Sequence, residues 1–145
     1  MNLKFISIAA TAVLIALAFA LVARGGLLGT GPISLSLQGT GLLLALWARL
    51  TFGLRSFHFA ANPTLGPLVT SGPYRYIRNP IYSAALLIIL TGVAVHWSLM
   101  NALLGALIAA MLIVRIACEE PLLRQAYPEY ESYARNTARL VPGLI

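Results

Sequence analysis

The chain has 145 residues, of which 59% are hydrophobic and only 10% are charged. This balance excludes an ordinary soluble globular domain and is typical of a small protein embedded in a membrane. The net charge of +6 is carried by isolated residues rather than by a basic run interleaved with aromatics, so we expect it to reflect membrane topology and not nucleic-acid binding.

Two apolar segments begin the chain and predict the first two membrane spans. Residues 3–23 are almost entirely Ala, Leu, Ile, Val and Phe, a run long enough for the roughly 20 residues that a spanning helix needs. The glycines that follow lack the G-x-G-x-x-G pattern of a nucleotide site, and we interpret them as a turn. A second span is predicted over residues 33–52, where small residues allow close helix packing: Gly39, Gly41, Ala45 and Ala48.

A polar interval over residues 53–79 separates these spans from two more. Its three arginines predict a cytoplasmic location by the positive-inside rule. Residues 81–97 and 99–117 are the predicted third and fourth spans, and the very short connection between them permits only an antiparallel hairpin. The fourth span carries a face of small residues: Ala102, Gly105, Ala106, Ala109 and Ala110.

The last segment, residues 121–140, is expected to form an amphipathic helical tail that begins at Pro121 and is interrupted at Pro128. Four spans place both termini on one side, and the arginines of the tail make that side cytoplasmic. The predicted fold is therefore one all-α integral membrane domain, residues 1–145, with four transmembrane helices and a tail that folds back over residues 66–82.

Three charged residues lie close together at the end of the fourth predicted span. Arg115 and Glu119 are four residues apart and share a helix face, so they either neutralise each other at the membrane interface or belong to a functional site. Glu120 adds a second carboxylate that this arginine does not pair. We expect Glu120 to bind a cation or a hydroxyl-rich ligand, unless it caps a helix that starts at Pro121.

No metal site and no disulfide are expected. His58 and His96 lie in loops that the predicted topology places on opposite faces of the membrane, so together they do not form a zinc site. Cys118 is the single cysteine, and we interpret it as a small buried apolar residue.

The second half of the chain carries an ordered set of motifs. LVTSGPYRYIRNPIY at residues 68–82 precedes the hairpin, RIACEEPLL at 115–123 follows it, and a Tyr-x-x-Tyr pair at 130–133 comes before a Val-Pro pair at 141–142. This order resembles the isoprenylcysteine carboxyl methyltransferase family and its phospholipid N-methyltransferase relatives. The resemblance covers residues 66–142, whereas the first two spans contribute hydropathy alone.

The resemblance implies an integral membrane enzyme that transfers a methyl group from S-adenosylmethionine to a lipophilic acceptor. The implied cofactor-binding residues, with the first four on the adenosine side, are Gly66, Pro67, Leu68, Val69, Tyr74, Asn79, Pro80, Ile81, Tyr82 and Glu119. The candidate catalytic residues are Arg115, which would face the acceptor, and Glu120. The acceptor stays open between the carboxylate of a prenylcysteine-like molecule and a lipid amine or thiol. The oligomeric state stays open as well.

The chain departs from the family pattern where Asn79 replaces a common histidine and where Tyr127-Pro128 replaces Phe-Gly. Asparagine donates and accepts hydrogen bonds but does not titrate, so position 79 is expected to bind ligand and not to shuttle protons. Two alternatives remain open: an NADPH-dependent membrane reductase related to sterol reductases, and a non-catalytic membrane scaffold. The short chain and its four predicted spans favour the methyltransferase over the reductase.

Overall fold

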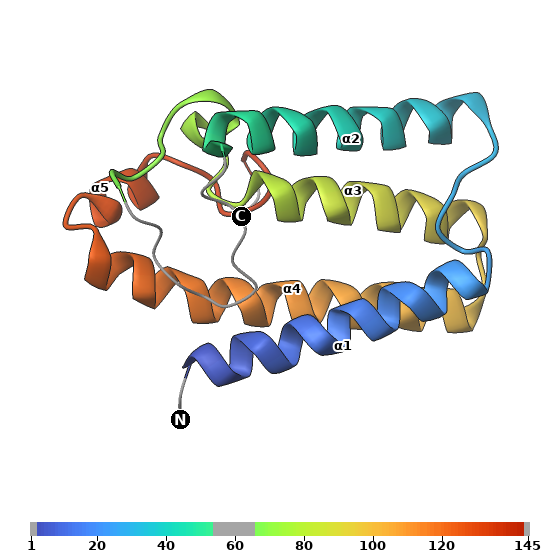
Figure 1. Ribbon diagram of the computed structural model, residues 1–145. Coiled ribbons are helices and arrows are strands. Elements are labelled where there is room, and N and C mark those ends of the chain that lie inside the picture. Colours follow the sequence, from blue (N-terminus) through green and yellow to red (C-terminus); the bar gives the residue numbers. More distant parts are fainter. Residues whose placement is uncertain (1–2, 54–65, 144–145) are drawn as a thin grey trace.

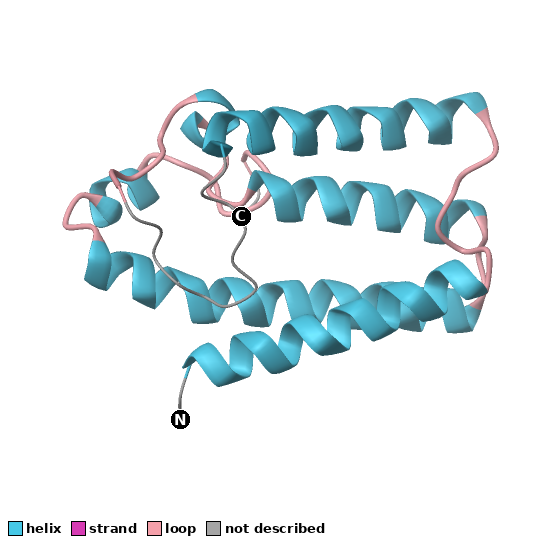
Figure 2. Ribbon diagram, viewed as in Figure 1, coloured by secondary structure: helices cyan, strands magenta, loops and turns pink. Residues whose placement is uncertain are grey.

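The computed structural model describes residues 3–53 and 66–143, and this part of the chain is a helical bundle without strands (Figures 1 and 2). His58 lies outside the described residues. The elements are α1 (Leu3–Ala23), α2 (Pro32–Phe52), the short 3-10 helix η2 (Gly72–Arg75), α3 (Pro80–Val95), α4 (Leu99–Ala126) and α5 (Tyr130–Arg135).

The long helices pack as two pairs. Helix α1 lies along α4, and α2 lies along α3, while α3 and α4 are joined by the predicted tight hairpin around His96 (Figure 1). A core of Leu21, Val93, Leu104, Ile108 and Leu112 connects α1, α3 and α4. The four helices therefore form one unit. The α1–α2 connection and the α3–α4 connection lie at the same end of it (Figure 1).

The outward faces of the helices are apolar, as expected for a multi-pass membrane protein. Large side chains such as Phe19, Ile33 and Leu50 are more than 70% exposed. Three described helices, α1, α2 and α4, are long and apolar enough to cross a membrane. Helix α3 is shorter, with 16 residues, and spans about 24 Å against the roughly 30 Å of a hydrocarbon core. The orientation of the termini stays a prediction.

The end of α4 differs from the prediction. The helix does not end near residue 117 and restart at Pro121 but continues through this proline to Ala126. A proline inside a helix removes one backbone hydrogen bond at a cost of about 3 kcal/mol. Side-chain bonds from Tyr82 to Glu119 and from Arg139 to Glu120 hold the turn just before the proline, and these bonds help to offset that cost.

The tail is less helical than predicted. Among the described residues beyond α4, only the six residues of α5 form a helix. The residues after α5 have no regular secondary structure and lie beside residues 76–79. Ala138 forms an isolated parallel bridge with Ile77, and Ser83 Oγ donates to the carbonyl of Leu140 at 2.6 Å. Tyr133 Oη donates to the carbonyl of Tyr74 at 2.7 Å. The tail thus folds back onto the segment before and at the start of α3, as the sequence predicted for residues 66–82.

The connecting end of the bundle is held by polar contacts and by a close backbone approach. Gln38 Nε2 donates to the carbonyls of Leu27 and Ile88, at 2.7 and 3.0 Å. A Cβ atom added to Gly92 would lie 2.0 Å from the Leu27 carbonyl oxygen, so only glycine fits there. Of the predicted small-residue positions in α2, Gly41 packs against α3, which places that face between the two helices.

Candidate active site

Three helices bring four polar side chains together beside the start of α3. We call Thr11 of α1, Tyr82 of α3, and Arg115 and Glu119 of α4 the Glu119 cluster. Arg115 donates to Glu119 Oε1 through Nε at 3.2 Å and through Nη2 at 2.8 Å. Tyr82 Oη donates to the same carboxylate, 2.7 Å from Oε1 and 3.0 Å from Oε2. Arg115 Nη1 donates to Thr11 Oγ1 at 2.5 Å.

The cluster is largely shielded from solvent but keeps unused hydrogen-bonding capacity. The Arg115 side chain is 11% exposed and that of Glu119 is 20% exposed. An arginine has five N–H bonds, and three of them are directed at Glu119 and Thr11. The second N–H of Nη1 and that of Nη2 take no part in these three bonds. The Tyr82 hydroxyl has one proton to share between the two oxygens of Glu119, and its oxygen lies closer to Oε1 than to Oε2. Glu119 Oε2 therefore keeps capacity to accept another hydrogen bond.

The depth of the cluster along α4 places it at the edge of the apolar layer. Helix α4 begins at Leu99. At a rise of 1.5 Å per residue, Arg115 lies about 24 Å along the helix and Glu119 about 30 Å, against a hydrocarbon core of roughly 30 Å. The backbone of Arg115 is therefore about one helical turn deeper in the apolar layer than that of Glu119. The Tyr82 ring lies 5.6 Å from Arg115 Cζ and adds a cation–π contact.

Glu120 does not have the free carboxylate that was expected. Its side chain is 5% exposed and accepts from Arg139, at 3.1 Å on Oε1 and 2.7 Å on Oε2, and from Arg78 Nε at 3.4 Å. It does not cap a helix either, because α4 continues through Pro121. Successive helix positions differ by about 100°, so Glu120 points away from Arg115 and toward segments that are distant in sequence.

Arg78 joins this carboxylate to the tail. Its Nη1 donates to the carbonyl of Ala134 at 2.5 Å and to the carbonyl of Thr137. Asn79, the neighbouring candidate cofactor residue, donates from Nδ2 to the carbonyl of Arg139 at 3.1 Å. In this structure the side chain of Asn79 thus holds the tail, and it makes no hydrogen bond to the described residues of the Glu119 cluster.

The aromatic residues of η2 and α5 are buried where the tail covers the chain. Tyr74 packs against Phe52 with ring centroids 5.5 Å apart, and burial raises the pKa of Tyr74 to about 12. Tyr130 is 2% exposed. Burial, followed by the nearby Glu120 carboxylate, raises the pKa of Tyr130 to about 12. Both phenols are therefore neutral and serve packing at ordinary pH.

The remaining predicted cofactor residues lie around the start of α3 and the loop before η2. Pro80 is fully buried at the first turn of α3, and Ile81 beside it is 37% exposed. Gly66 and Pro67 are exposed, whereas Leu68 and Val69 are partly buried. The structure thus brings Tyr82, Arg115 and Glu119 into direct contact, and it shows no hydrogen bond between residues 66–69 and this cluster.

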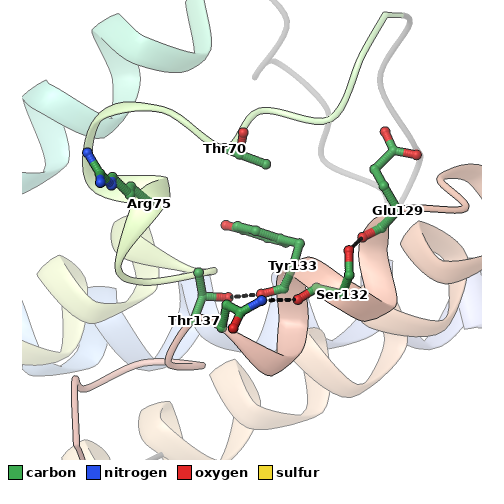
Figure 3. A pocket seen from close by; sticks show the side chains of 7 residues that line it. Thr70, Arg75, Glu129, Ser132, Tyr133 and Thr137 are labelled. Atoms are coloured by element: carbon green, nitrogen blue, oxygen red, sulfur yellow. Dashed lines mark hydrogen bonds between the residues drawn. The ribbon is translucent and has the colours of Figure 1, made fainter.

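A pocket of about 450 Å³ lies between the loop before η2 and the tail (Figure 3). It is lined by Thr70, Arg75, Glu129, Ser132, Tyr133, Asn136 and Thr137. The sequence analysis assigned none of these residues to the site. The signal was present, because residues 129, 132, 133, 136 and 137 are polar or amphipathic at helical spacing. Ser132 donates to the carbonyl of Glu129 and Thr137 donates to the carbonyl of Tyr133, so both hydroxyl oxygens can still accept hydrogen bonds.

No group of three or more His, Cys, Asp or Glu side chains that suits a metal ion occurs among the described residues. His96 Nε2 lies 2.7 Å from the carbonyl oxygen of Leu28, where it joins the two turns. Cys118 is buried, as predicted.

A family model described as phospholipid methyltransferase matches residues 30–130. The chain belongs to the phospholipid methyltransferase family. This is a family of membrane methyltransferases, so the resemblance is confirmed at that level and the narrower isoprenylcysteine assignment stays a prediction. The matched region includes Tyr82, Arg115 and Glu119 but excludes α1 and the second half of the tail.

Two curated relatives share the region. A cobalt-zinc-cadmium resistance protein, CzcN, of Cupriavidus metallidurans is 37% identical over 114 residues, which cover 78% of this chain and 51% of the relative. A nickel-cobalt-cadmium resistance protein, NccN, of Alcaligenes xylosoxydans xylosoxydans is 35% identical over 78 residues, which cover 53% of this chain and 37% of the relative. The chain therefore spans about half the length of these relatives or less. No solved structure matches it.

Proposed function

We propose that this membrane methyltransferase uses S-adenosylmethionine to methylate a lipophilic acceptor at the membrane surface. The observation that carries the proposal is the Glu119 cluster, in which Tyr82 from α3 and Arg115 from α4 hold one carboxylate at the edge of the apolar layer. A carboxylate in such a position is costly unless it serves a site, and here one of its oxygens remains able to accept.

The residues of the cluster fit the charge of this methyl donor. S-adenosylmethionine supplies a methyl group on a positively charged sulfonium, whose carbon–sulfur bond breaks as a lone pair of the acceptor forms the new bond. Carboxylates and aromatic faces attract such cations. Glu119 Oε2 and the ring of Tyr82 offer both, and the hydrogen bond from Tyr82 keeps the carboxylate in one orientation.

We assign the adenosine portion to residues 66–69 and to the adjoining pocket that begins at Thr70 (Figure 3). The pocket falls in the size range of small-molecule sites. The hydroxyl oxygens of Ser132 and Thr137 remain acceptors, which suits the ribose hydroxyls and the adenine amine. Tyr74, Asn79, Pro80 and Ile81 are proposed to contact the rest of the cofactor.

Arg115 is assigned to the acceptor, because it lies one helical turn deeper along α4 than Glu119 and has two N–H bonds besides those to Glu119 and Thr11. A guanidinium orients an oxygen-bearing head group well. An acceptor carboxylate reacts without a base, whereas an amine or a thiol first loses a proton. Glu120 is assigned to the tail and not to catalysis, since both of its oxygens are occupied by arginines.

Calorimetric titration of the purified protein with S-adenosylmethionine, its demethylated product and NADPH tests the proposal. We expect saturable binding of the first two and none of NADPH. Binding of NADPH alone would establish the reductase, and silence with all three ligands would favour the scaffold. Transfer of a labelled methyl group to phosphatidylethanolamine vesicles or to N-acetyl-S-farnesylcysteine then identifies the acceptor class.

A further inference from the structure

Helix α1 lies outside the matched family region, yet it contacts the proposed site through Thr11. We propose that Thr11 is a positioning residue that fixes the guanidinium of Arg115 for the acceptor. The inference rests on the proposed function and adds a residue that neither the family match nor the sequence motifs indicate.

The hydrogen bonds of Thr11 give its hydroxyl a single role. Thr11 Oγ1 donates its proton to the carbonyl of Ser7, one turn earlier in α1, at 2.7 Å. A hydroxyl has one proton, so toward Arg115 it acts only as an acceptor. The side chain is 9% exposed, and its direction is fixed by both bonds. Thr11 therefore presents a lone pair to Nη1 from a constant position.

Arg115 needs this second anchor because Glu119 alone leaves it able to turn. Both bonds from Arg115 to Glu119 end on the same oxygen, Oε1. A single acceptor atom is a pivot about which the planar guanidinium can rotate. The bond to Thr11 comes from another helix and meets a third nitrogen. Together these contacts determine the direction of the two N–H bonds that remain for the acceptor.

Charge neutralisation does not explain the contact, since Glu119 already supplies the opposite charge within 2.8 Å. What Thr11 adds is direction, and direction matters most for a transfer reaction that requires donor and acceptor to be aligned. Loss of the hydroxyl is therefore expected to affect use of the acceptor and to leave binding of the methyl donor unchanged.

Ser7 provides a matched control on the same helix. It lies one turn before Thr11 and is fully buried. Its Oγ is the one buried side-chain oxygen or nitrogen among the described residues without a hydrogen-bond partner. Ser7→Ala thus removes a hydroxyl from the α1–α4 contact without breaking a bond, whereas Thr11→Val removes one that holds Arg115.

The experiment compares wild type, Thr11→Val, Thr11→Ser and Ser7→Ala in lipid nanodiscs. It measures the Kd of S-adenosylmethionine by calorimetry, and kcat and KM for whichever of the two acceptor probes is methylated. Thr11→Val is expected to lower kcat/KM for the acceptor about ten-fold, the scale of one hydrogen bond to a charged group. Thr11→Ser should restore it, Ser7→Ala should match wild type, and the Kd should stay constant.

Several outcomes overturn the inference: an unchanged kcat/KM in Thr11→Val, equal losses in Thr11→Val and Ser7→Ala, or a weaker Kd that accounts for the loss. If wild type does not bind S-adenosylmethionine, the proposed function fails instead. If neither probe is methylated, or if Thr11→Val does not fold, hydrogen exchange of the Arg115 side chain by NMR decides. Wild type is then compared with the milder Thr11→Ala, and unchanged exchange refutes the role of Thr11.

Discussion

The contact between Glu120 and two arginines predicts how firmly the tail is attached. Arg78 is 11% exposed and Glu120 is 5% exposed, whereas Arg139 is 47% exposed. Removing Arg78 leaves the buried Glu120 with only the half-exposed Arg139 as its partner, and it frees two backbone carbonyls that Arg78 holds, at about 1–3 kcal/mol each. A half-exposed pair contributes about 1 kcal/mol or less. Arg78→Gln should therefore destabilise the protein several times more than Arg139→Gln.

The two substitutions also differ in the backbone bonds that they remove. Arg78 holds the carbonyls of Ala134 and Thr137 in addition to Glu120, so Arg78→Gln releases the tail at two points and removes one bond to α4. Arg139 binds Glu120 alone through its side chain. The shorter glutamine reaches neither set of partners in full. Local release of the tail should therefore accompany the loss of stability in the first variant and not in the second.

Two measurements test this ranking in detergent solution. Chemical unfolding followed by circular dichroism gives the free energy of unfolding, and limited trypsin digestion reports cleavage after the exposed Arg135. We expect Arg78→Gln to lower the free energy of unfolding by about 3 kcal/mol or more and to accelerate cleavage. If Arg139→Gln costs as much, or if cleavage after Arg135 is unchanged in Arg78→Gln, the buried pair does not hold the tail and the reasoning is wrong.

Three further predictions use other parts of the structure. Glu119→Gln should weaken S-adenosylmethionine binding about ten-fold in calorimetry, since it replaces the carboxylate that faces the sulfonium; an unchanged Kd would remove Glu119 from the site. The pKa values of Tyr74 and Tyr130 are raised from 10 to about 12, so the stability that they contribute should be complete below pH 10 and lost as the pH rises toward 12. Spectrophotometric tyrosine titration, with unfolding measured at each pH, checks the sign. Gly92→Ala should destabilise the bundle, because the added Cβ would lie 2.0 Å from a carbonyl oxygen, whereas Gly39→Ala, which meets nothing within 4 Å, serves as the control in thermal unfolding.

The parts of the fold that depend on local composition could be predicted from the sequence. The first predicted span, residues 3–23, has the bounds of α1, and the second differs from α2 by one residue. An apolar run of spanning length has few other options in a membrane. The prediction for the end of α4 was wrong because local propensity makes a proline a helix start or stop. In this structure the helix continues through Pro121, and Glu119 and Glu120 beside it accept hydrogen bonds from residues distant in sequence.

In the candidate site too, local contacts could be predicted from the sequence and long-range contacts could not. Arg115 and Glu119 are four residues apart, so their contact follows from helix geometry, and the motif order indicated Tyr82 as well. The partners of Glu120 are 42 and 19 residues away in sequence. No spacing rule connects them, and the free carboxylate predicted for Glu120 was wrong for that reason. Thr11 was missed because a single threonine in an apolar helix carries no signal until its neighbour is known.

The two adjacent glutamates explain how one helix end serves both the site and the tail. Glu119 and Glu120 differ by about 100° around α4, so one carboxylate faces Tyr82 and Arg115 while the other faces Arg78 and Arg139. A shift of this helix end moves both carboxylates together. The carboxylate that binds the tail and the carboxylate proposed to face the sulfonium are thus on the same turn of α4. Release of the tail by Arg78→Gln should therefore disturb the Glu119 cluster, whereas Glu119→Gln leaves the contacts of Glu120 in place.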